Sequence, residues 1–105
     1  MFVLVSPAGE SRARVAVQDV QDLSQLHVEF RGVSDQAASK ALADAGLGEA
    51  DGEIAWLMVT ALRMAASGGT GSDWARRFDA MLGYAQRSGW TDAKLSRVRA
   101  HIVRT

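Results

Sequence analysis

The stretch RVRAHIV, residues 97–103, decides how the sheet of this protein is built. Every second side chain in it is apolar, and arginine or histidine occupies the positions between, which is the pattern of a half-buried strand. Val98 and Ile102 also share one face of a helix with Leu95, so a helix is the alternative. The β-branched residues and the short length favour a strand over about 96–104.

Three further strands are expected in the first third of the chain. Residues 2–5 form a continuous apolar run and residues 12–17 alternate in polarity, while Pro7 and Gly9 lie between them. Proline presets the first bend of a turn and glycine accepts the left-handed position, so the two segments are expected to form a hairpin. Residues 26–31 alternate again and give the third strand.

The middle of the chain is expected to hold three helices. The first spans about 35–45, between an N-cap at Ser34 and a glycine stop. The second is expected to start at an N-cap, Asp51, and to run to about residue 67, because its apolar residues recur at helical spacing. The third follows Ser72 and ends at Gly89. The glycine-rich residues 68–71 are expected to connect the second and third helices.

These elements predict an α+β fold in a single domain over residues 1–105. The sheet is expected to be small and antiparallel, in the order β-β-β-α-α-α-β, with the three helices packed on one face. A chain of 105 residues, 48% of them apolar, has the size and composition of one globular domain.

Charge and composition exclude several classes of function. The 12 basic and 12 acidic residues cancel, so no overall field attracts the chain to nucleic acid or to a membrane. There is no cysteine, which excludes disulfides, thiolate nucleophiles and cysteine metal sites. The N-terminus lacks the basic start of a secretory signal, and the longest apolar run, from Ile54 to Met64, is too short to span a bilayer. A cytoplasmic location is therefore expected.

The strongest candidate site is a basic face on the sheet. If the tail is a strand, the residues opposite the apolar positions share the face that the helices leave uncovered. Seven of them are basic or histidine and one is acidic: Arg12, Arg14, His27, Glu29, Arg31, Arg97, Arg99 and His101. The acids are expected to concentrate around the first two helices instead, at Asp35, Asp44, Glu49, Asp51 and Glu53.

The leading functional hypothesis is a small non-catalytic module that binds a ligand or a partner. An acidic protein or an anionic small molecule would fit the arginines of the basic face. A homodimer is also expected, because residues 2–5 are apolar on both faces of their strand and one face needs cover.

Two other hypotheses remain open. A small enzyme could use His27, Glu29 and His101 for proton transfer, with arginines holding an anionic substrate. A DNA-binding regulator could present Arg76 and Arg77 on the third helix, although the balanced net charge makes nucleic acid a poor partner. No cofactor and no metal site are predicted, since neither histidine lies in a metal-binding pattern.

Overall fold

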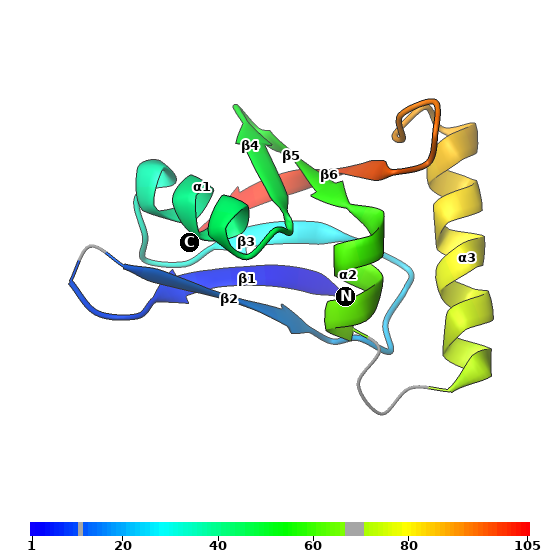
Figure 1. Cartoon of the computed structure of the whole chain (residues 1–105), viewed down its shortest axis with the longest axis horizontal. Helices are drawn as coiled ribbons and strands as arrows, with labels where there is room; N and C mark the ends of the chain where they lie inside the picture. Colours follow the sequence, from blue (N-terminus) through cyan, green and yellow to red (C-terminus); the bar gives the residue numbers. More distant parts are fainter. Residues whose placement is uncertain (11, 67–70) are drawn as a thin grey trace.

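The computed structural model describes residues 1–10, 12–66 and 71–105 as a small α+β domain with six strands and three helices (Figure 1). The strands form one mixed sheet in the order β2-β1-β3-β6-β5-β4. In chain order the elements are β1 (Phe2–Pro7), β2 (Ala13–Gln18), β3 (His27–Phe30), α1 (Asp35–Asp44), β4 (Gly48–Asp51), β5 (Ile54–Met58), α2 (Val59–Ala66), α3 (Ser72–Arg87) and β6 (Arg97–Arg104).

The tail is a strand, as the alternation in residues 97–103 predicts. β6 lies inside the sheet, between β3 and β5. The predicted hairpin of β1 and β2 and the predicted third strand are confirmed as well. The expected antiparallel sheet is wrong, because β3 runs parallel to both β1 and β6. Alternation shows which residues form strands, but it carries no information about the neighbour or direction of each strand.

The predicted helix over residues 51–67 is wrong in its first half. β4 and β5 form a hairpin with a two-residue turn, in which Asp51 pairs with Ile54. The helix α2 begins only at Val59. Gly52, at the first central position of the turn, has a φ of 65°, which a hairpin turn requires there and glycine accepts readily. Asp51 is therefore the last residue of a strand and not a helix N-cap, and the observed element order differs from the predicted one.

The other two predicted helices are present. The backbone N–H of Ala37 donates to Ser34 Oγ at 3.1 Å, which confirms the predicted cap of α1. α3 forms where expected, but Gly71 occupies its N-cap position and Ser72 is its first residue. The expected connector at residues 68–70 lies outside the described residues.

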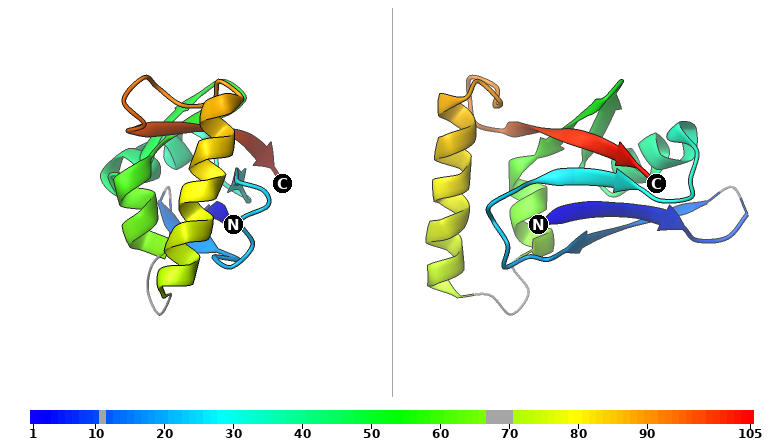
Figure 2. Two further views of the ribbon diagram at one scale, coloured as in Figure 1. Left: turned by 90° about the vertical axis from the view of Figure 1, so that its right-hand side faces the viewer. Right: turned by 180° about the vertical axis from the view of Figure 1, so that it is seen from behind.

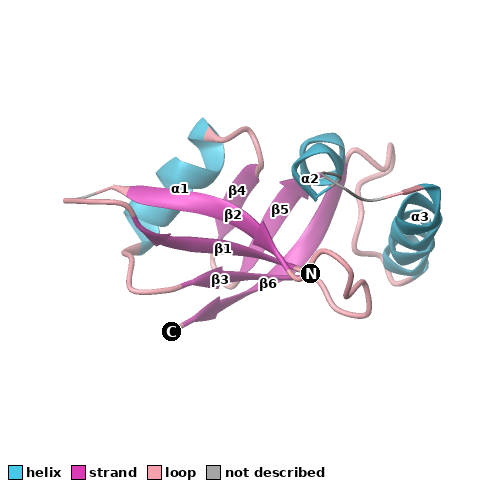
Figure 3. Ribbon diagram, turned by 90° about the horizontal axis from the view of Figure 1, so that it is seen from below, coloured by secondary structure: helices cyan, strands magenta, loops and turns pink. Residues whose placement is uncertain are grey.

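The three helices were expected to cover one face of the sheet, but only two of them do. α1 and α2 pack on the same face, whereas α3 lies across the end of the sheet, beside α2 (Figures 2 and 3). Nine core side chains from the sheet point to the covered face: Val3, Val5, Val28, Phe30, Ala55, Leu57, Val98, Ala100 and Ile102. No helix in the described part of the chain is long and apolar enough to cross a membrane.

Arg104, at the end of β6, ties the sheet to α1 and to the β4–β5 turn. Its guanidinium donates to the Asp35 carboxylate at 2.9 and 3.0 Å and to Glu53 at 3.1 Å. The hydrogen bonds from Arg104 lower the pKa of Asp35 below its ordinary value. A carboxyl group with a lowered folded-state pKa stabilises the fold above its unfolded pKa, and that stability is lost as the pH falls through the folded value.

We predict that Arg104→Met weakens the fold at neutral pH and that this difference fades in acid. The reason is that Asp35 gains stability from Arg104 only while it is ionised. Urea midpoints of both proteins, measured from about pH 6 down to about pH 2.5, should converge below the ordinary aspartate pKa of about 3.9. Lys40→Met, which removes an exposed pair with Asp44, is the control. A difference between wild type and Arg104→Met that is independent of pH would contradict the prediction.

Candidate functional site

The strand registers place most of the predicted site residues on the uncovered face of the sheet. His27 pairs with His101 across β3 and β6, and Phe2 lies next to His27 on the other side. The Phe2 and His27 rings stack with centroids 4.9 Å apart. Arg99 lies two residues before His101 on the same face of β6, and its register partner is Trp56 of β5. Two histidines, an arginine and apolar side chains therefore occupy the middle of this face.

The arginines do not form one patch. Arg14 pairs with Ser6 near the far end of the sheet, and Arg31 follows β3 at that same end. In the β3–β6 register, Arg31 lies beside the end of β6, eight residues from Arg97. The two arginines are therefore roughly 25 Å apart along the strands. Arg12 precedes β2 and lines a depression beside α1. A single ligand of small size cannot contact them all.

Several of these arginines already have acidic partners. Arg97 contacts Glu49 at 3.3 Å and Asp92 at 3.7 Å, and Arg31 forms an ion pair with Glu29. Arg99 is exposed and forms no hydrogen bond or ion pair through its guanidinium with another described residue.

The expected division into a basic sheet and an acidic helical layer is wrong. Glu49 and Asp51 lie on β4, because residues 48–51 are a strand and not part of a helical region. Glu49 pairs with Trp56, which in turn pairs with Arg99, so these acids share the uncovered face with the arginines.

The three residues of the enzyme hypothesis are only partly brought together. His27 and His101 are direct neighbours, but Glu29 lies two positions further along β3, where its register partner is Val103. The Glu29 carboxylate is ion-paired to Arg31. Among the described residues, no group of three or more histidines and carboxylates could hold a metal ion.

The arginines of the DNA-binding hypothesis are also engaged. Arg76 contacts Asp73 at 3.0 Å, and Arg77 contacts the same carboxylate at 3.3 Å. Arg77 further donates to the backbone oxygen of Gln21 at 2.9 Å and to its side chain at 2.6 Å. These contacts tie α3 to the loop before β3 and leave less of its positive charge for a phosphate backbone.

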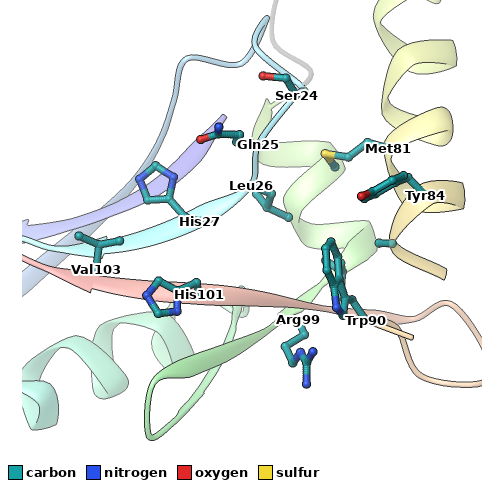
Figure 4. Close-up of a pocket in the computed structure, with 12 residues that line it drawn as sticks. Ser24, Gln25, Leu26, His27, Met81, Tyr84, Trp90, Arg99, His101 and Val103 are labelled. Atoms are coloured by element: carbon teal, nitrogen blue, oxygen red, sulfur yellow. The ribbon is translucent and has the colours of Figure 1, made fainter. Parts of the chain in front are cut away.

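A cleft opens where β6 extends past β3. Only the second half of β6 pairs with β3, since that pairing begins at His27 and His101. Beyond this point the chain before β3 diverges from β6, and the space between them is closed by the C-terminal half of α3 and by Trp90 (Figure 4). Trp90 is fixed by its backbone: its N–H donates to Ala85 at 2.8 Å, and its oxygen accepts from Arg99 at 2.7 Å.

This main cleft has a volume of about 570 Å³. Met81 and Tyr84 of α3 form one wall together with Trp90, whose ring meets that of Tyr84 edge to face at 5.7 Å. Leu26 lies at its centre (Figure 4). No aspartate or glutamate among the described residues lines the cleft. Its polar lining consists of Ser24, Gln25, His27, Tyr84, Arg99 and His101.

A smaller side depression of about 290 Å³ continues from the main cleft toward β5. The two share Leu26, Trp90, Arg99 and His101, and the side depression adds Ile54. Together they form one groove, lined on the α3 side by aromatic residues and on the β6 side by Arg99 and His101.

Sequence reasoning missed the groove, although it found the histidines and Arg99. Met81 is partly buried, packs against the core and also lines the cleft. Tyr84 is 59% exposed and Trp90 39% exposed. Their exposure is known only from the structure, and the signal available in the sequence was the closeness of these two aromatic residues, six positions apart.

Comparison with known proteins adds no functional assignment. No protein-family model matches the chain, and no curated protein or solved structure shows significant similarity to it.

Proposed function

We propose that this protein is a small non-catalytic module that binds a ligand in the main cleft. The observation that carries the proposal is a cleft of about 570 Å³ that is lined by an exposed aromatic wall and by a few polar side chains. Small-molecule sites are concave, mostly apolar and about 300–1,000 Å³ in volume. The anionic small molecule expected from the basic face would bind here, and not across the whole face.

The contacts of Glu29 favour binding over catalysis. An acid–base site needs a base and a group that orients it. The carboxylate of Glu29 is paired with Arg31, so it is not held against the imidazole of His27 or His101. The homodimer expected from the sequence stays a prediction, and Phe2 and Leu4 are the partly buried apolar residues on the uncovered face that would contribute to it.

We predict that an uncharged apolar dye binds in the main cleft and that Met81→Lys weakens this binding about tenfold or more. N-phenyl-1-naphthylamine, whose fluorescence rises in apolar sites, is the probe. Met81 supplies part of the apolar wall. Loss of its contacts costs about 1.5–3 kcal/mol if the probe buries it fully, and each 1.4 kcal/mol is a factor of ten in affinity.

Met58→Lys is the matched control, because Met58 is 39% exposed and lies outside the groove. Circular dichroism should show that both variants keep the fold. The proposal fails if the wild-type protein does not bind the dye, or if the two variants lose affinity equally.

A further inference from the structure

The groove combines aromatic side chains with an arginine and a histidine from β6. At α3 it presents the ring edges and faces of Tyr84 and Trp90 beside the sulfur of Met81. Sulfur and aromatic rings both make favourable contacts with another ring. Arg99 and His101 of β6 line both the main cleft and the side depression, as Trp90 does, and the backbone N–H of Arg99 donates to the Trp90 oxygen at 2.7 Å.

The guanidinium of Arg99 forms no ion pair with a described acid, although Asp51 lies on the same sheet face, opposite Ile54, the register partner of His101. Glu49, which faces Arg99 across Trp56, is held by Arg97 at 3.3 Å. Asp22, close in sequence to the Ser24 side of the cleft, does not line it, and its carboxylate accepts hydrogen bonds from the Ser24 N–H at 3.1 Å and hydroxyl at 2.5 Å. Arg99 thus has its donors available to a ligand, as far as the described residues show.

We propose, on the basis of the function proposed above, that the natural ligand is a planar aromatic compound with a single anionic group. Its ring would lie against Tyr84 and Trp90, and its carboxylate or similar anion would accept hydrogen bonds from Arg99. A guanidinium presents paired N–H donors that match the two oxygens of a carboxylate. His101, next to Arg99 along the same face of β6, supplies a second polar contact.

A set of three matched compounds tests this inference. Indole-3-acetate, indole-3-acetamide and tryptamine carry the same ring with an anionic, a neutral and a cationic end. Isothermal titration of the full chain should give an affinity for the acetate about tenfold higher than for the amide, with tryptamine weakest, because only the acetate forms a charge-assisted pair with Arg99.

Arg99→Gln should lower the affinity for indole-3-acetate to that for the amide and leave the affinity for the amide unchanged. Arg14→Gln is the matched control, since Arg14 is an exposed arginine at the far end of the same sheet face. Binding of the acetate by Arg14→Gln should equal that of wild type.

The outcomes separate the two proposals. If the neutral dye binds but the acetate and amide bind equally, or if Arg99→Gln and Arg14→Gln behave alike, the anionic ligand is excluded and the cleft remains a binding site. If decanoate competes with the dye as strongly as indole-3-acetate does, the aromatic specificity is excluded. If the wild-type protein does not bind the dye, the proposed function itself fails.

Discussion

Replacing Phe78 with alanine is expected to cost about 3–5 kcal/mol of unfolding free energy, the range found when a buried aromatic side chain is truncated. Phe78 is completely buried in α3. Its ring stacks on Trp74 at 5.0 Å, and the guanidinium of Arg63 from α2 lies 4.6 Å from the ring centroid on its surface. The total free energy of unfolding of a domain is about 5–15 kcal/mol, so Phe78→Ala should show a large fall in the urea midpoint.

Two variants give this prediction its controls. Phe78→Leu keeps most of the apolar volume and should cost about 1.5 kcal/mol or less. Tyr84→Ala removes an aromatic ring from the exposed face of the same helix and should cost about 1 kcal/mol or less, while it weakens dye binding. Equal losses of stability in Phe78→Ala and Tyr84→Ala would show that α3 is not anchored through Phe78.

The binding test depends on this anchoring. α3 lies across the end of the sheet and carries Met81 and Tyr84, which form one wall of the main cleft (Figure 1). The indole N–H of Trp74 donates to the backbone oxygen of Val20, and so joins the start of α3 to the loop that leads into β3. A variant that loosens α3 should therefore lose ligand affinity together with much of its stability, whereas Tyr84→Ala should lose affinity with little loss of stability.

Local sequence patterns predicted the strands and helices that have one clear signal. Alternation with β-branched residues identified β6, and Ser34 identified the start of α1. Residues 54–58 carry no such signal, because the run IAWLM fits a buried strand as well as a helix, and α2 follows it directly. Gly52 followed by Glu53 directly before an apolar run has the glycine-first pattern of a two-residue hairpin turn, and it could have separated the two.

The candidate site was predictable in its residues but not in its shape. Alternation along β3 and β6 placed His27, His101 and Arg99 on one face, and the register brings the two histidines side by side. The cleft results from the difference in length between β3, with four residues, and β6, with eight. It also depends on where α3 crosses the sheet end, which is set by long-range packing around Trp74 and Phe78 and leaves no local pattern.

Gly48→Ala is expected to lower the free energy of unfolding by about 3 kcal/mol, which is the upper end of the usual cost of overpacking. The added methyl group would clash with the backbone of the neighbouring strand, β5. A Cβ on Gly48 would lie 2.1 Å from the carbonyl oxygen of Trp56 and 3.0 Å from its carbonyl carbon. Trp56 cannot move away easily, because β5 is held between β4 and β6. Gly48 pairs with Leu57, in the second half of the apolar run at residues 54–58, so closely that only glycine fits there.

Gly46→Ala is the control for backbone strain without a clash, since Gly48 also has a positive φ, of 158°. Gly46 has a φ of 69°, and a Cβ there would meet nothing within 4 Å. Its replacement should cost only the left-handed backbone strain of about 1–2 kcal/mol. Urea denaturation of both variants measures the difference, and a loss in Gly48→Ala no larger than that in Gly46→Ala would mean that β4 does not approach β5 this closely.

Because Glu49 follows Gly48, displacement of β4 should also release Arg97 from its 3.3 Å contact with Glu49. The acid would then be free to pair with Arg99, so Gly48→Ala should reduce the preference for indole-3-acetate over its amide.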